Sequence, residues 1–114
     1  MSAELLTLVT ITDLTRAVTE RYANFPLTTV NDHVVKVSVM TETYDWHFHP
    51  NSDETFLGVE GVLLIDLETE TIELQPGQLF TVPKNVKHQT RPKAERSVNL
   101  TVECSQIETV FVHH

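Results

Sequence analysis

Residues 46 to 54 read Trp46-His47-Phe48-His49-Pro50-Asn51-Ser52-Asp53-Glu54, and most of what the sequence reveals starts from this segment. Side chains alternate between the two faces of a strand, so His47 and His49 share one face while the aromatic residues share the other. Two imidazoles on one face, roughly 6.6–6.8 Å apart along the strand, can converge on one cation. The turn after Pro50 lets the chain double back and bring Glu54 beside them.

A fourth candidate ligand, His88, lies further along the chain. Taken singly, His88 would be interpreted as an ordinary core or surface histidine, and Glu54 as a solvated carboxylate. Together, three neutral imidazoles and one carboxylate suit a divalent transition metal (Fe, Mn, Ni, Zn or Cu), and the ligand types do not decide which one. Such a site would carry a net positive charge and would favour carboxylates, enolates or diols that bind through oxygen.

Length and composition restrict the class of protein. The chain has 114 residues and a formal net charge of −8, which favours one domain and argues against nucleic acid as a partner. No apolar run approaches the ~20 residues of a membrane span, and no secretion signal is visible at the N-terminus. The single cysteine excludes an intramolecular disulfide and fits a reducing compartment. We therefore expect a cytoplasmic protein with no membrane partner.

Turn residues recur every eight to twelve positions or so, which is the pattern of an all-β sandwich or barrel. One helix is expected over residues 13–22, where apolar residues recur every fourth position. Residues 1–30 would then form a strand-and-helix segment that packs on a barrel of residues 31–114. The expected strands are 34–40, 44–49, 55–59, 62–67, 71–74, 79–82, 88–91, 97–104 and 107–112.

Several single residues carry expectations of their own. Cys104 alternates with valine and leucine, so it is expected to be a small buried hydrophobe rather than a nucleophile. Lys36 is expected in solvent, with a pocket-facing acid or anion clamp as the alternative. Gly58 lies inside a strand and indicates a bulge or a close backbone approach. A run of cations is expected to be solvated, or else to form a positive rim at a pocket mouth. These cations are Lys84, Lys87, Arg91, Lys93 and Arg96.

From Thr41 onward the sequence resembles the cupin superfamily. The first cupin motif, His-x-His followed by a glutamate and a glycine, is matched by His47, His49, Glu54 and Gly61. The second, a glycine, a proline and a histidine, is matched by Gly77, Pro83 and His88. Three motif positions differ, and none is a ligand: Thr41 and Asn85 replace glycines, and Pro92 replaces an asparagine. Asparagine tolerates left-handed backbone better than most residues, so the turn at Asn85 should survive.

The resemblance implies an all-β fold, a single-domain jelly-roll β-barrel of the small microbial cupin type, with a short N-terminal helix. It also implies one metal site inside the barrel, held by His47, His49, Glu54 and His88. Gly61 and Gly77 would occupy turns with positive φ.

Three functions fit this pattern. The first is a metal-dependent enzyme that acts on a small oxygen-chelating metabolite with dioxygenase-like chemistry. The alternatives are an enzyme that resembles a sugar or sugar-phosphate isomerase or epimerase, and a non-catalytic protein that binds a small molecule. No general acid or base is evident beside the ligands, which slightly favours oxygen chemistry and leaves the catalytic residues unknown. Exposed barrel edges and the apolar run at residues 5–11 favour a homodimer.

Overall fold

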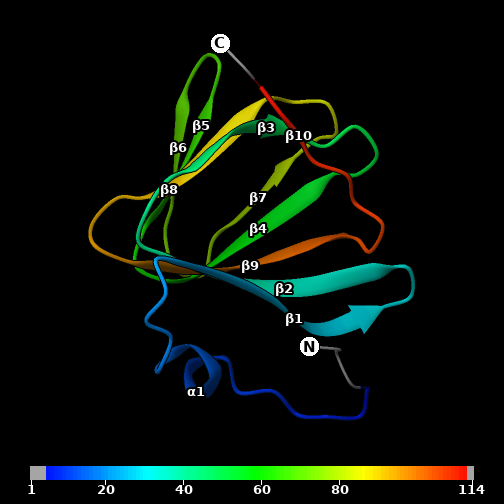
Figure 1. Ribbon diagram of the computed structural model, residues 1–114, viewed down its shortest axis with the longest axis vertical. Coiled ribbons are helices and arrows are strands. Elements are labelled where there is room, and N and C mark those ends of the chain that lie inside the picture. Colours follow the sequence, from blue (N-terminus) through cyan, green and yellow to red (C-terminus); the bar gives the residue numbers. More distant parts are fainter. Residues whose placement is uncertain (1–4, 113–114) are drawn as a thin grey trace.

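A computed structural model describes residues 5–112 of the chain. Two five-stranded antiparallel sheets enclose the interior of the molecule (Figure 1). Strands far apart in the sequence are neighbours, as β2 and β9 are in one sheet and β3 and β8 in the other, so the expected jelly-roll barrel is confirmed. The strand orders are β1-β2-β9-β4-β7 and β10-β3-β8-β5-β6. The elements are α1 (Ile11–Thr15), β1 (Tyr22–Val30), β2 (His33–Met40), β3 (Tyr44–Phe48), β4 (Glu54–Glu60), β5 (Leu63–Leu67), β6 (Thr71–Leu74), β7 (Leu79–Val82), β8 (His88–Pro92), β9 (Ser97–Cys104) and β10 (Val110–Phe111).

The helix expected over residues 13–22 is placed too late and is too long. The helix α1 ends at Thr15, and Tyr22 begins β1, a strand that the sequence pattern does not reveal. Pro26 conceals this strand, because proline cannot donate to a sheet and is tolerated only at edges and bulges. Here β1 is an edge strand, and its register with β2 shifts between Pro26 and Thr28. The expected boundary at residue 30 falls within the β1–β2 hairpin.

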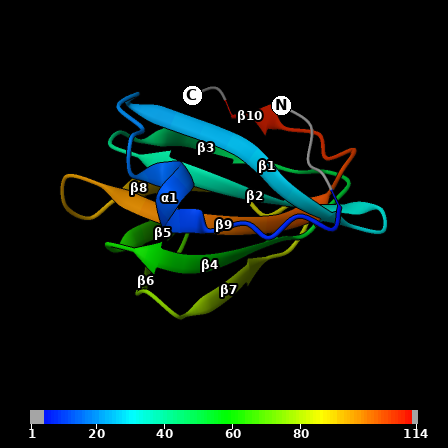
Figure 2. The same cartoon turned by 90° about the horizontal axis from the view of Figure 1, so that it is seen from below.

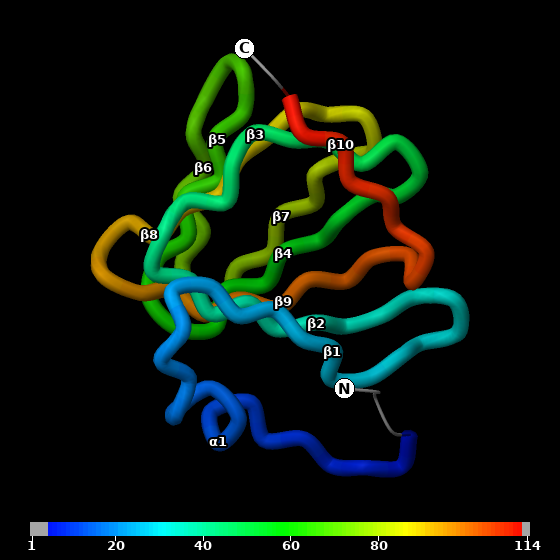
Figure 3. Tube along the Cα trace, in the orientation of Figure 1, coloured from blue at the N-terminus to red at the C-terminus, as the bar shows by residue number. Residues whose placement is uncertain are grey.

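The two ends of the described chain have little regular structure. The apolar run at residues 5–11 forms no strand, and the side chains of Leu5, Leu6 and Leu8 are exposed. The strand expected at residues 107–112 is limited to β10, which pairs with the β3 edge beside the C-terminal end (Figure 3). His113, His114 and the first four residues lie outside the described range. Within residues 5–112, no helix is long and apolar enough to span a membrane.

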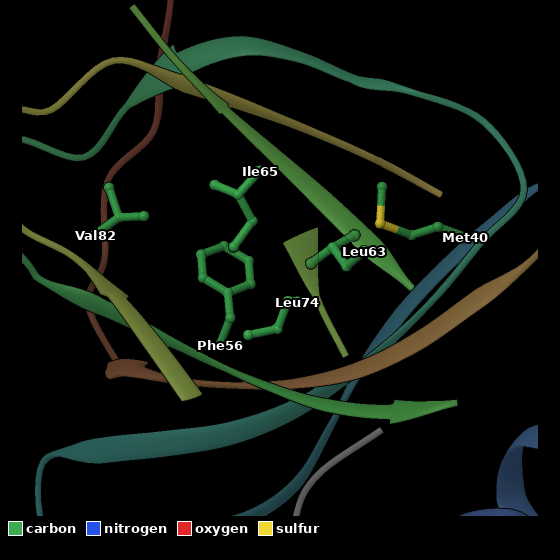
Figure 4. Packing of buried hydrophobic residues seen from close by; sticks show 6 residues of the cluster. All are labelled: Met40, Phe56, Leu63, Ile65, Leu74 and Val82. Atoms are coloured by element: carbon green, nitrogen blue, oxygen red, sulfur yellow. The ribbon is translucent and has the colours of Figure 1, made fainter. Parts of the chain in front are cut away.

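Two hydrophobic clusters hold the sheets in place. The outer cluster, centred on Leu27, Val37 and Val98, lies under the N-terminal segment, where α1 crosses β2 and β9 (Figure 2). The inner cluster fills part of the space between the two sheets (Figure 4). Its buried members are Met40, Phe56, Leu63, Ile65, Leu74 and Val82.

The turns behave as the sequence indicates. Gly58 lies at a register shift between β4 and β9, and a Cβ atom there would come within 2.3 Å of the Gln75 backbone oxygen. The expected bulge and close approach at Gly58 are both confirmed. Asn85 has a φ of 70°, and Gly61 and Gly77 also have positive φ, so the turn expectations are confirmed too.

Candidate metal centre

Each of the four candidate ligands is placed by the start or end of a strand. His47 belongs to β3 and lies directly opposite His88, the first residue of β8. His49 follows β3, and Glu54 begins β4 in the other sheet. All four are buried, and one ligand atom from each lies within 4.8 Å of the others. The barrel thus brings together the whole set expected from the sequence.

Backbone carbonyl groups orient the three imidazoles. The Nδ1 atom of His47 lies 2.7 Å from the oxygen of Asp45. The corresponding Nδ1 distances are 2.9 Å from His49 to the Glu108 oxygen and 2.9 Å from His88 to the Val86 oxygen. A carbonyl oxygen only accepts, so each Nδ1 donates its proton, and in the neutral form of each imidazole the lone pair is on Nε2. Hydrogen bonds of this kind usually fix the orientation of metal-binding histidines.

The atoms at the centre of the cluster lack conventional partners. Glu54 Oε1 lies 3.3 Å from the Nε2 of His49 and 3.4 Å from the Nε2 of His88. Among the described residues, these three atoms are buried without a hydrogen bond of acceptable geometry. Unsatisfied buried polar atoms are costly, and a cation between them would satisfy all three. Three imidazole nitrogens and one carboxylate oxygen are a suitable donor set for a divalent transition metal, so the residues fit this group.

The protonation states also suit a cation. Burial, assisted by the nearby His88, lowers the pKa of His47 to about 4, so this imidazole is neutral at neutral pH. Burial alone would raise the pKa of Glu54, but the close imidazoles of His49 and His88 favour the carboxylate and hold it at about 2. For His49, burial opposes protonation, and the Glu54 carboxylate outweighs it and raises the pKa. A metal ion would replace the proton that His49 and Glu54 attract between them.

The cluster opens into a cavity of about 200 Å³. His47, His49 and Glu54 line this cavity, while His88 is fully buried behind them. The facing wall comes from β1, β2 and β9 and is mainly polar, because these strands turn alternate polar side chains inward. Its polar residues are Tyr22, Asn24, Lys36, Ser38, Asn99, Thr101 and Glu103.

The expectation that Lys36 would be solvated is wrong. It lines the cavity, and its Nζ lies 3.5 Å from Glu103 Oε2. The reason is that Val37 and Val39, its neighbours on the opposite face of β2, are buried in the outer cluster. The face of the strand that looks apolar therefore lies outside the barrel, under the N-terminal segment.

Sequence reasoning missed the contribution of β9 to the polar wall of the cavity. Asn99, Thr101 and Glu103 are buried and point inward, and Thr101 Oγ1 donates to Glu103 Oε1 at 3.0 Å. The alternation of residues 97–104 is visible in the sequence, but both faces contain residues able to pack inside a protein. A usable signal is the presence of three polar residues at every second position of a strand otherwise rich in valine and leucine.

Two further expectations need correction or narrowing. Cys104 is only half-buried, on the outer side of the sheet, where it lines a surface pocket with His33 and Lys84. None of the five clustered cations lines the central cavity, so the positive rim has no support there. Arg91 instead binds Asp66 at 2.8 Å, and Arg96 donates to the Thr15 oxygen.

Comparisons with known proteins agree with this geometry. Residues 33–102 match the family described as the cupin domain. YdbB, an uncharacterized protein of Bacillus subtilis, is 48% identical over 96 residues, which cover 83% of this chain and 84% of YdbB. A cupin-2 domain containing protein from Shewanella frigidimarina superposes with a TM-score of 0.79 at 25% identity, over 85% of this chain and 94% of that one. A cupin sugar phosphate isomerase from Silicibacter pomeroyi has a TM-score of 0.70 at 15% identity, over 82% of this chain and 67% of its own, a likeness of fold alone.

Proposed function

Because this chain belongs to the cupin domain family, with the family match over residues 33–102, we propose that it is a metal-dependent enzyme. Its substrate would be a small metabolite that binds the metal through oxygen atoms. The observation that carries this proposal is the convergence of four buried ligand atoms within 4.8 Å of one another. The fixed Nδ1 hydrogen bonds leave every Nε2 free to coordinate, which supports a metal role over a purely structural one.

His47, His49, Glu54 and His88 would hold one divalent ion, and their donor atoms leave the choice among Fe, Mn, Ni, Zn and Cu open. When bound, such an ion supplies Lewis-acid polarisation and orients the oxygen atoms of the substrate. The cavity supports a small substrate, because its volume of about 200 Å³ is below the roughly 300–1,000 Å³ of sites for drug-sized ligands.

The cavity wall bears on the type of reaction. The sequence alone favours dioxygenase-like chemistry, because no general acid or base is evident in it. Glu103 lines the cavity and is a candidate for the general acid or base that the sequence did not reveal. Burial, together with the charge of Glu54, raises the pKa of Glu103, while Lys36 opposes that rise. A carboxyl group able to take up and return a proton supports isomerase- or epimerase-like chemistry as the leading reaction class. Dioxygenase-like chemistry is the second candidate, supported by a donor set that suits iron.

Removal of one ligand tests the metal proposal. His88→Ala should lose bound metal and turnover, and His33→Ala, at an exposed histidine, serves as the matched control. Elemental analysis of protein purified without added metal provides the readout, with circular dichroism to check that both variants fold. If His88→Ala keeps its affinity for a small ligand unaltered, the protein is a non-catalytic binding protein and the enzyme proposal fails.

A substrate screen separates the two reaction classes. Hydroxy and oxo acids, sugars and phenols would be offered aerobically and anaerobically to metal-loaded protein. Aldose–ketose or epimer conversion without oxygen uptake, abolished in Glu103→Gln, supports proton transfer. Oxygen uptake that survives Glu103→Gln supports the dioxygenase-like alternative instead.

We also propose a homodimer in the cytoplasm as the working form, without a nucleic-acid or membrane partner. Leu6 and Leu8 support the dimer, because both residues are fully or almost fully exposed and a second copy could cover them. The single cysteine and the net charge of −8 are the sequence features that support the location and the absence of nucleic acid. Analytical ultracentrifugation of the wild type and of the Leu6→Glu/Leu8→Glu variant tests the dimer, which should dissociate in the variant.

A further inference from the structure

We propose that Lys36 anchors the carboxylate of the substrate, and that the substrate is a small hydroxy acid. In this arrangement two neighbouring oxygen atoms of the molecule would bind the metal, and its carboxylate would extend to Lys36. The inference rests on the proposed metal-dependent function and specifies its substrate class.

The register of three neighbouring strands places Lys36 two strands away from the ligand Glu54 in the same sheet, with Glu103 on the strand between them. Glu54 on β4 lies opposite Glu103 on β9, while Lys36 on β2 lies opposite Thr101, two residues away on the same strand. Adjacent strands are about 4.7–4.9 Å apart, so two strand spacings, roughly 10 Å, separate the Glu54 and Lys36 backbones across the sheet. Both side chains line the same cavity, so a small molecule bound at the ligands can extend toward Lys36.

The distribution of charge indicates an anion. Among the described residues that line the cavity, Lys36 is the sole lysine or arginine, and it shares the wall with Glu54 and Glu103. Glu103 contacts the ammonium group at 3.5 Å, and the Lys36 side chain keeps 28% of its surface exposed. An ammonium group has three donors, so Lys36 can bind a second carboxylate without leaving Glu103. A divalent ion held by one carboxylate would add further positive charge to the same cavity.

Asn99 provides an independent sign of a ligand. The residue is 1% exposed and lines the cavity, and its Oδ1 atom has no hydrogen-bond partner among the described residues. A buried amide oxygen without a donor is costly, so the site favours a ligand that brings one. A hydroxyl group is the matching donor. Hydroxyl and carboxylate in one molecule, together with oxygen atoms for the metal, define a hydroxy acid.

The competing explanation is that Lys36 only neutralises Glu103. The two explanations predict different binding affinities once Glu103 loses its charge. If Lys36 is an anchor, Glu103→Gln frees the ammonium group and strengthens the binding of an anion. If Lys36 is merely the structural partner of Glu103, removing the Lys36 side chain leaves the preference for an anion unchanged.

The experiment uses the full-length protein loaded with Co²⁺, whose visible absorption reports on the metal centre. Glycerate and glycerol serve as probes, because both carry a vicinal diol and only glycerate has a carboxylate. Calorimetry should give glycerate an affinity at least about tenfold above that of glycerol in the wild type. Lys36→Met should abolish this difference while Co²⁺ binding persists, and Lys36→Arg should retain most of it. Lys87→Met, at an exposed lysine outside the cavity, should behave as the wild type.

Glu103→Gln should tighten glycerate binding about threefold or more, and the gain should vanish in the Lys36→Met/Glu103→Gln double variant. If Co²⁺-loaded Lys36→Met still prefers glycerate, Lys36 does not anchor the carboxylate, although the metal site is intact. Failure of the wild type to distinguish the two probes, or to bind either, overturns the substrate class. Failure of the wild type to bind Co²⁺ contradicts the proposed function itself, and the inference falls with it.

Discussion

The interior of this barrel has an apolar part and a polar part, and two strands, β2 and β4, contribute to both. Leu63 and Ile65 on β5 pack tightly in the inner cluster, with 1% and 0% of their surfaces exposed. The polar part contains the cavity, and the oxygen of Asn99 and the nitrogens of two histidines there lack partners. Phe56 and Met40 belong to both parts, since they pack in the cluster and also line the cavity.

The difference between the two parts shows which residues stabilise the fold and which reduce its stability. Burial of the apolar cluster provides the favourable free energy, while unsatisfied polar groups around the cavity reduce it. Violations of ordinary packing rules of this kind collect at functional sites. Phe56 links the two parts directly, because its ring lies edge-on to the His88 ring with a centroid distance of 6.2 Å.

Ile65→Ala tests the apolar part and should have the largest effect on stability. Removing a fully buried isoleucine side chain costs about 2–5 kcal/mol in free energy of unfolding, because the cavity it leaves closes only partly. Urea unfolding monitored by circular dichroism provides the measurement. The matched change in the polar part, Asn99→Ala, should cost about 1 kcal/mol or less, because the space it leaves joins an existing cavity. Equal losses in the two variants would contradict the division of the interior.

Asn51→Ala tests how the polar part is held in place and should have an intermediate effect. The Asn51 side chain donates to the Gln106 oxygen at 2.9 Å and accepts from the Glu108 backbone nitrogen at 2.8 Å. This clamp fixes the carbonyl group of Glu108 that orients His49. We expect metal affinity to fall about tenfold, at the lower end of the usual range for residues that orient a metal ligand, with little change in stability. Competition with a chelator measures the affinity, and Gln78→Ala, remote from the site, is the control. Unchanged affinity would show that His49 needs no such clamp.

Asp66→Asn extends the comparison to the ion pair of a buried carboxylate on β5 and should have the smallest effect. The Arg91 guanidinium holds the pKa of Asp66 at about 2, below its ordinary value of 3.8. A carboxyl whose pKa is lowered by folding stabilises the protein above its ordinary pKa, and this contribution is lost as pH falls from about 4 to about 2. The gain is small because the Arg91 side chain is 41% exposed. Unfolding free energies measured in urea across this pH range should decline less steeply in Asp66→Asn than in the wild type. A parallel decline would leave this ion pair without a role in acid stability.

Most of the strands could be predicted from the sequence because alternation and turn residues are local signals. The predicted bounds of the strands from β2 to β9 agree with the structure to within one or two residues at each end. The errors fall where local signals compete. Pro26 argues against a strand, although an edge strand tolerates it. Leu14, Val18 and Tyr22 imitate a helix, yet Tyr22 pairs with Met40 in the sheet.

The candidate ligands could be predicted because they form motifs of fixed spacing, whereas the rest of the cavity wall could not. The sequence favours solvent for Lys36, since an isolated lysine in a strand is usually exposed. Its true direction depends on the N-terminal segment, which covers the valines on the opposite face of β2. Glu103 escapes sequence reasoning for a related reason, because its importance arises from β4 and β2 lying on either side of β9.

The sequence by itself determined the periodicity of the strands, the turns at Gly77 and Asn85, and the identity of the four candidate ligands. These properties depend on residue type and on neighbours within a few positions, which any local pattern can reveal. Only the tertiary structure decided which face of β2 and β9 lies inside, and so placed Lys36 and Glu103 in the same cavity as His47. The physical reason is that a strand has two faces of equal geometry, and only packing against distant segments selects which of them is buried.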